Sequence, residues 1–439
     1  MLDKDKAKEI IGKLASYTDN YAVASVMETE QDTTRFANSE ISQNTSISDA
    51  VASITVYDGK KEASCSGNVL TDEGLRKLAS DADEILKYVP DGDYEAFKLS
   101  SEDIKEFVSD GGLRKAFGVN ERARLVADGV SGVAWGFTSA GALTFENSIF
   151  ALGDKDVQRY TSMECLKFNT VVTHESGAAG GGECISYSAD GLDIAAEFAK
   201  AKNDAKLAIG PVPIDTGAYT VVLSPVAFGN LLMYVTWMLN AKTVDDGISF
   251  AVGKLGEKVF GENITIRDDV NYPGSQPFYF DFEGNKRKVL PLIEKGVIKN
   301  ILHDNKTAAK QKINSTGHAV SNTGRGGFPM NAVMDAGDKS LEEIIRETPK
   351  GIFINEFHYT NFVNPRILQI TGLTRNGAFL IENGRLTKPV TTMRFTQNMV
   401  EGLNNVSALS SGLAKINVFD RAYMVPAARI ENFRFTSRQ

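Results

Sequence analysis

Alternation of apolar and polar residues constrains the fold of this chain more than any other feature of its sequence. Near the amino terminus the alternation runs through four consecutive stretches, separated by short turns such as Asp58-Gly59. A period of two is typical of strands with one buried face, and short turns join antiparallel neighbours. We therefore predict an antiparallel meander from residues 21–28, 33–43, 47–57 and 61–69.

Helical patterns accompany this sheet. Residues 3–17 place four apolar side chains on one face, and Thr71 followed by two acidic residues is a good N-cap for a second helix. One or two further helices are expected within residues 102–129, strand-like stretches within 132–173, and a strong helix over 192–207. We therefore predict an α+β amino-terminal domain over residues 1–208.

The second half of the chain reads as a separate domain. The segment "IGPVPIDTG" has two prolines and two glycines, which predicts a linker over residues 209–218. A strand at 219–223 is followed by Ser224-Pro225, an N-cap and first helical residue. Two hairpins are expected further on, one of them at Asn383-Gly384. Residues 219–439 thus predict a second α+β domain built on a large, mainly antiparallel sheet.

Composition excludes several classes of protein. The formal net charge is −8 and no dense run of Lys or Arg occurs, so we expect no nucleic-acid partner. The longest apolar run, residues 231–239, is too short to span a bilayer, and the charged amino terminus does not resemble a secretory signal. Three widely spaced cysteines imply no disulfide framework. We expect a cytoplasmic protein without a membrane partner.

One short stretch, "THESGAAGGGEC", gathers reactive side chains. His174, Glu175, Glu183 and Cys184 fall within eleven residues, around a run of glycine and alanine. A zinc-binding helix needs a second ligand one turn after the first, and here Ser, Gly and Ala follow His174-Glu175 instead. We interpret the stretch as a glycine-rich turn with exposed polar residues, and keep a hydrolase site at these four residues as a lesser alternative.

An ordered series of motifs resembles the TldD/TldE family, also called PmbA or modulator of DNA gyrase. Its amino-terminal members are "TRFANSEISQ" and the helix after "SGNVLTDEG". The most specific part runs from about residue 219 to 395 and contains "VVLSPVAFGNLLMYVTWM", "DDGISF", "DFEGNKRKVLPLIEKGVIKNILHDNKTA", "STGHA" and "IENGRLTKPV". The resemblance covers nearly the whole chain.

This chain departs from the family's catalytic pattern. TldD-type members carry His-Glu-x-x-x-His on the helix after the Ser/Gly-Pro element, and a cysteine near the carboxyl terminus. Superposing that pattern puts Met233 at the first His, Tyr234 at the Glu and Met238 at the second His. Residues 407–415 offer serines where a Cys-Gly pair would stand. A thioether is a poor zinc ligand and Tyr cannot replace a carboxylate base. We therefore expect no catalytic residue, no metal and no other cofactor in this chain.

The resemblance implies a function. A TldE-like chain pairs with a TldD-like catalytic subunit, and the pair is a cytoplasmic metallopeptidase acting on unfolded polypeptides or peptides. This chain would be the non-catalytic subunit that shapes the chamber, and the name modulator of DNA gyrase does not imply DNA binding. Residues 358–377 differ from the glycine-rich run usual in the family. A stand-alone homodimeric peptide-binding protein is the main alternative.

Peptide binding would favour strand addition at a sheet edge, which reads the peptide backbone. Candidate polar contacts are Asn38 on the amino-terminal strand and Arg375 in "TGLTRNG". The long irregular segment 316–329 adds Thr316, His318 and Arg325.

Overall fold

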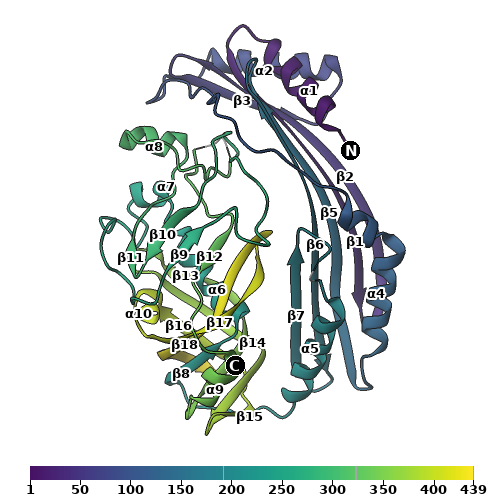
Figure 1. Ribbon diagram of the computed structural model, residues 1–439, viewed down its shortest axis with the longest axis vertical. Helices are drawn as coiled ribbons and strands as arrows, with labels where there is room; N and C mark the ends of the chain where they lie inside the picture. The colour runs from purple at the N-terminus through teal and green to yellow at the C-terminus, as the bar shows by residue number, and fades with distance from the viewer. Residues whose placement is uncertain (191, 322–323, 439) are drawn as a thin grey trace.

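The computed structural model describes residues 1–190, 192–321 and 324–438. Two β-sheets organise the chain, one from strands β1 to β7 and the other from strands β8 to β18. Figure 1 shows the first sheet as a long curved layer and the second as a more compact body beside it. The predicted two-domain α+β fold is confirmed.

The first sheet has the strand order β3-β2-β1-β5-β6-β4, and β7 pairs with β6. All of its pairings are antiparallel except β4 with β6. Its strands are β1 (Tyr21–Ala37), β2 (Glu40–Asp58), β3 (Lys61–Gly67), β4 (Phe107–Val108), β5 (Phe137–Gly153), β6 (Gln158–His174) and β7 (Ala179–Ser186).

Helices α1, α2 and α4 cover the face of the first sheet that is turned away from the second sheet (Figure 1). The predicted N-cap forms, since the Thr71 side chain accepts a hydrogen bond from Gly74 N at 3.2 Å. The apolar stripe of α1 is buried against the sheet. The helices of this domain are α1 (Lys4–Ser16), α2 (Asp72–Leu86), α3 (Gly112–Ala116), α4 (Val119–Ser131) and α5 (Ile194–Leu207).

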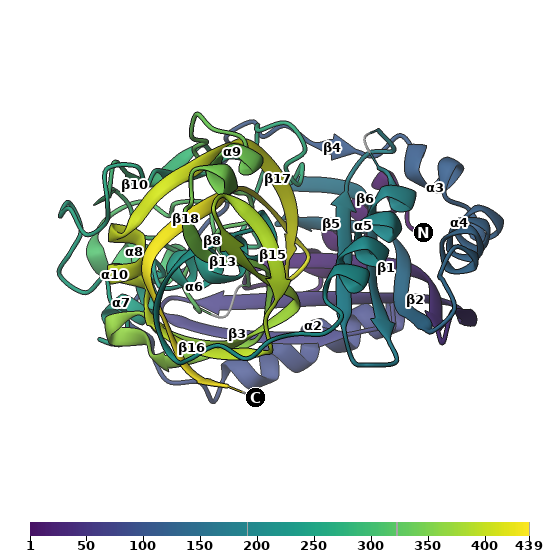
Figure 2. The ribbon, with the colours of Figure 1, turned by 90° about the horizontal axis from the view of Figure 1, so that it is seen from below.

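The second sheet closes on itself. Strand β8 pairs with β13 in parallel and with β18 in antiparallel orientation, so β18, β16, β14, β13 and β8 form a ring (Figure 2). Its strands are β8 (Gly217–Leu223), β9 (Ile266–Asp268), β10 (Leu290–Glu294), β11 (Val297–Ile298), β12 (Ala332–Met334), β13 (Lys350–Asn364), β14 (Gln369–Glu382), β15 (Arg385–Pro389), β16 (Met393–Asn398), β17 (Val406–Val418) and β18 (Arg421–Arg438).

Helix α6 (Pro225–Trp237) is the central helix of the second domain. Ser224 caps it as predicted, because the Ser224 hydroxyl accepts from Ala227 N at 3.1 Å and Pro225 occupies the first helical position. Apolar residues surround α6, which packs against β18, β13 and β17. The other helices here are α7 (Ala241–Asp245), α8 (Asn305–Gln311), the 3₁₀ turn η1 (Pro365–Ile367), α9 (Leu341–Arg346) and α10 (Met399–Asn404). In the described part of the chain, no helix has both the length and the apolar character needed to cross a bilayer.

Three local predictions were wrong. The breaks expected at residues 29–32 and 44–46 are absent, because β1 and β2 run through them without interruption. Residues 33–43 are not one strand, because Asn38 and Ser39 have φ of 51° and 61° and form the turn between β1 and β2. The run Gly180-Gly181-Gly182 is not a turn but the middle of β7. A Cβ on Gly180 would lie 2.2 Å from the Ala201 carbonyl oxygen of α5, so glycine permits the close approach of that helix.

The segment predicted as a linker is attached to the second domain. Val212 N donates to the Pro389 carbonyl at 2.9 Å, and Thr391 N donates to the Val212 carbonyl at 3.1 Å. Strand β8 begins at Gly217. The domain boundaries themselves stay a prediction.

A buried ion cluster fixes the irregular part of the second domain. Asp268 and Arg287 pair at 2.5 Å with both side chains fully buried, and His318 Nε2 lies 3.3 Å from the same carboxylate. Burial raises the pKa of Asp268, but the charges of Arg287 and His318 together with backbone N–H donation hold it well below its usual range. The N–H groups of Met330 and Asn331 donate to this carboxylate at 2.6 and 2.8 Å.

We predict that Arg287→Met lowers the free energy of unfolding by about 3–5 kcal/mol, because it leaves the Asp268 carboxylate buried without its cation. The matched control is Arg267→Met, which removes partly exposed ion pairs to Asp269 and Asp335 and should cost no more than about 1 kcal/mol. Urea unfolding at pH 7 measures both. Equal losses in the two variants would contradict the assigned role of the cluster.

Candidate functional site

Helix α6, which the resemblance makes the counterpart of a metal-binding helix, is packed as core in this chain. Met233 and Tyr234 are each 6% exposed and Met238 is 8% exposed. The Tyr234 hydroxyl donates to Thr360 Oγ1 at 3.1 Å, and its ring meets Phe362 edge-on at 4.7 Å. These side chains fill the space in which a metal and its ligands would have to fit.

The residues present do not fit the metal that the resemblance implies for catalytic members. Within the residues that the structure describes, no group of three His, Cys, Asp or Glu side chains is placed to hold a metal ion. The serines that replace the expected cysteine are engaged locally: Ser407 Oγ donates to Glu431 at 2.8 Å, and Ser410 Oγ donates to the Gly412 carbonyl at 2.8 Å.

The structure does not bring His174 and Cys184 together. Cys184 pairs with Phe168 on β6, six residues before His174, which corresponds to roughly 20 Å along the strand. His174 Nδ1 lies 2.8 Å from Ser176 Oγ, and Glu175 is exposed in the same turn. Burial raises the pKa of Cys184 to about 12, which disfavours a thiolate nucleophile. The lesser alternative of a hydrolase at these residues therefore lacks its geometry.

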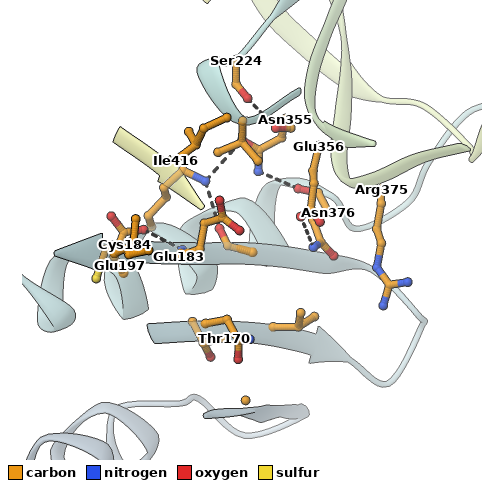
Figure 3. Close-up of a pocket in the computed structure, with 18 of the residues that line it drawn as sticks. Thr170, Glu183, Cys184, Glu197, Ser224, Asn355, Glu356, Arg375, Asn376 and Ile416 are labelled. Carbon is orange, nitrogen blue, oxygen red and sulfur yellow. Dashed lines mark hydrogen bonds between the residues drawn. The ribbon is translucent and has the colours of Figure 1, made fainter. Parts of the chain in front are cut away.

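A cleft lies between the two domains. Its volume is about 940 Å³. The first domain lines it with the β1–β2 turn, β5, β6, β7 and α5, and the second domain with the start of α6, β13, β14 and β17. Figure 3 shows Glu183, Glu356, Asn376 and Ser224 converging on it from both sides.

Glu183 is a strongly perturbed carboxyl group in this cleft. Burial, reinforced by the negative charges of Glu356 and Glu197, raises the pKa of Glu183 to about 7, although the N–H of Asn417 and the charge of Lys200 oppose the shift. The Glu183 backbone N–H donates to Glu197 Oε2 at 3.1 Å. Perturbed carboxyls in clefts are frequent at functional sites.

A hydrogen-bond network holds the two domains in register at this site. Lys200 Nζ on α5 donates to the Gly181 carbonyl at 2.9 Å and to Asn355 Oδ1 at 3.2 Å. The backbone carbonyl of Asn355 in turn accepts a hydrogen bond from the Ser224 hydroxyl at 2.5 Å. On the neighbouring strand, Asn376 Nδ2 donates to Glu356 Oε2 at 2.5 Å.

Of the five peptide-contact candidates, two line the cleft. Asn38 is exposed in the β1–β2 turn, and Arg375 on β14 is exposed beside His358, 2.9 Å from its Nδ1.

The other three candidates lie elsewhere. Thr316 Oγ1 accepts from His303 N at 2.9 Å and donates to the His303 carbonyl at 3.0 Å. Arg325 is exposed outside the cleft lining. His318 is 0% exposed in the ion cluster and so is closed to a ligand in this structure.

Sequence reasoning missed Lys200, Glu197, Asn355, Glu356 and Asn376. The only available signal was Asn376-Gly377, which is typical of a hairpin turn. Here both residues lie inside β14, with φ of 52° and 108°. An Asn-Gly pair within a strand distorts it and redirects side chains, but it cannot be told from a turn without the structure.

Comparison with known proteins identifies the family. Residues 216–437 match the model of the PmbA/TldA metallopeptidase C-terminal domain, and residues 22–86 match that of PmbA/TldA metallopeptidase domain 1. A metalloprotease of Methanothermobacter thermautotrophicus is 27% identical over 203 residues, 45% of this chain and 44% of that protein. A metalloprotease of Methanocaldococcus jannaschii is 27% identical over 278 residues, 61% and 60% of the two chains. The matches thus span about half the length of these two relatives.

Other comparisons extend over most of the chain. Metalloprotease PmbA of Escherichia coli O157:H7 is 22% identical over 415 residues, 87% of this chain and 86% of that protein. The structure of TldE from Thermococcus kodakarensis superposes with a TM-score of 0.84 at 20% identity, covering 98% and 99% of the two chains. A Thermotoga maritima modulator of a DNA gyrase gives 0.83 at 20% identity, covering 99% and 100%, and these two likenesses show the fold. Because the model of the C-terminal domain matches half of the chain and the domain 1 model matches a part of the first half, the chain belongs to the TldD/TldE (PmbA) metallopeptidase family.

Proposed function

We propose that this chain is the non-catalytic, TldE-like subunit of a cytoplasmic metallopeptidase of the TldD/TldE type, and that its cleft handles unfolded or peptide substrates. Helix α6 carries the proposal. Met233, Tyr234 and Met238 stand where the family pattern has its two His and the Glu, and all three are buried in core packing. The partner subunit, a TldD-like chain, would then supply the metal and the catalytic carboxylate.

Edge strands support the second part of the proposal. Among the described strands, β7 pairs only with β6 and β17 only with β18, and residues of both line the cleft. An edge strand can pair with an extended peptide through backbone hydrogen bonds, which suits a subunit that accepts many sequences. On β7 such a peptide would replace the bonds of the Gly181 carbonyl to Lys200 and of the Glu183 N–H to Glu197. Asn38 and Arg375 remain the proposed side-chain contacts from the sequence.

Mixing this chain with a TldD-like protein from the same source, one that carries His-Glu-x-x-x-His, tests the pairing. We expect a single hetero-oligomer by size-exclusion chromatography with light scattering, and peptide cleavage by the mixture but not by this chain alone. Separate elution with no gain in activity would contradict the proposal. If, in addition, this chain alone formed a homodimer that bound peptide, the alternative of a stand-alone peptide-binding protein would replace the proposal.

Tyr234→Phe tests whether the α6 position is structural or catalytic. We expect the variant to lose about 1 kcal/mol of stability, because the hydrogen bond to Thr360 is removed, and to leave the peptidase activity of the mixture unchanged. Tyr359→Phe, at an exposed position, is the matched control and should change neither quantity. Loss of activity in Tyr234→Phe at full stability would mean that this chain takes part in the chemistry.

A further inference from the structure

The cleft contains carboxylates that the protein does not neutralise. Among the described residues, Glu183, Glu197 and Glu356 form no ion pair with Lys, Arg or His. Glu197 Oε2 lies against the Glu183 backbone. An added Cβ on Gly181 would lie 3.1 Å from Glu356 Oε2, and Gly181 is two residues from Glu183 on the same face of β7. Glu356 therefore lies about 7 Å or less along the strand from Glu183.

The nearby cations are committed elsewhere. Lys200 Nζ is surrounded by the Gly181 carbonyl at 2.9 Å, Asp204 at 3.1 Å and Asn355 at 3.2 Å. Lys415 Nζ donates to Ser186 Oγ at 3.3 Å, and burial lowers the pKa of this lysine. Arg375 is held beside His358. None of these groups offers its charge to the glutamates from within hydrogen-bond distance.

A second, independent feature points to a missing donor. Asn376 lines the cleft, is only 6% exposed, and donates from Nδ2 to Glu356. Its Oδ1 is buried and has no hydrogen-bond partner in the described residues. A buried acceptor without a donor costs free energy, and such groups are rare in native structures unless a ligand or water completes them.

We infer that the cleft beside β7 binds a primary ammonium group carried by a peptide, with Glu183 and Glu356 as its counter-charges and Asn376 Oδ1 as a further acceptor. An ammonium has three donors and no acceptor, which matches the acceptors of Glu183, Glu356 and Asn376 Oδ1. The donors of Lys200, Lys415 and Arg375 are engaged by other groups. The group could be the amino terminus of the peptide or a lysine side chain. This inference rests on the proposed function, because it names the chemistry of the substrate which that function requires.

Binding of three forms of one eight-residue Gly/Ser/Ala peptide to the full chain tests the inference and separates the two sources. The forms are a free amino terminus without lysine, an acetylated amino terminus without lysine, and an acetylated amino terminus with one central lysine. We expect at least one ammonium-bearing form to bind ten-fold or more tighter than the acetylated lysine-free form by titration calorimetry. Equal binding of all three forms, or no binding of any, would overturn the inference.

Variants locate the site. Glu183→Gln and Glu356→Gln should each remove most of the preference for the ammonium-bearing form. Glu175→Gln is the matched control, because Glu175 is exposed in the β6–β7 turn outside the cleft lining, and it should bind as the unmodified chain does. An equal loss in Glu175→Gln would overturn the assignment to the cleft. Pairing with a TldD-like subunit is measured separately, so that the proposed function and this inference can fail independently.

Thermal unfolding of each variant shows whether a loss of peptide binding is only a loss of the folded state.

The carboxyl of Glu183 faces Glu356 on β13, Glu197 and Lys200 on α5, and the N–H of Asn417 on β17. Arg375 and Lys415 also line the cavity.

Because the pKa of Glu183 is raised from 4.5 to about 7, its ionisation destabilises the free fold increasingly as the pH rises through that interval. Glu183→Gln should therefore melt about 1–4 °C higher at pH 8 and unchanged near pH 4.5. A lower melting temperature at pH 8 would contradict the account of the site.

Discussion

The cleft depends on a junction that fastens the two domains together at a distance from it. Phe150 of β5 packs against Phe278, Phe280 and Phe282 with ring centroids 5.9, 5.9 and 5.1 Å away. Nearby, buried Arg159 donates to the Gly284 carbonyl at 2.8 Å across the domains. The cleft end of β5 lies roughly 30 Å along the strand from this junction. Burial of these aromatic side chains at one end of β5 thus fixes the distance between the two domains at the cleft, which lies at the other end of the strand.

Small residues then give the cleft its shape. Glycine at 180 and 182 lets α5 lie directly on β7, since added Cβ atoms would fall 2.2 and 2.4 Å from carbonyl oxygens of that helix. Gly181 on the opposite face leaves room for Asn376 and Glu356. The strand therefore has a helix on one face, the second domain on the other, and one edge unpaired within the described sheet. The same three glycines, Gly180 to Gly182, thus allow both the packing of α5 on β7 and the approach of the second domain.

Local patterns in the sequence predicted many of the helices, strands and turns, but not the contacts between elements that are distant in the sequence. The caps at Thr71 and Ser224, the turn at Asn383-Gly384 and the α+β class follow from chemistry within a few residues, and the structure has them. Ring closure of the second sheet, the strand at Gly180 and the convergence of Glu183 with Glu356 depend on contacts between residues far apart in the chain. His318 shows the same limit, because its burial beside Asp268 is invisible in "STGHA".

The packing of α6 and the carboxyl groups without ion pairs in the cleft support the proposal of a subunit that binds substrate without a metal of its own. Elemental analysis of the full chain, purified alone without chelators, tests this account most directly. We predict far less than one zinc, or other transition metal, per chain. One metal per chain, retained through gel filtration, would contradict this prediction, because Met233, Tyr234 and Met238 are buried and the described residues contain no ligand set for that ion.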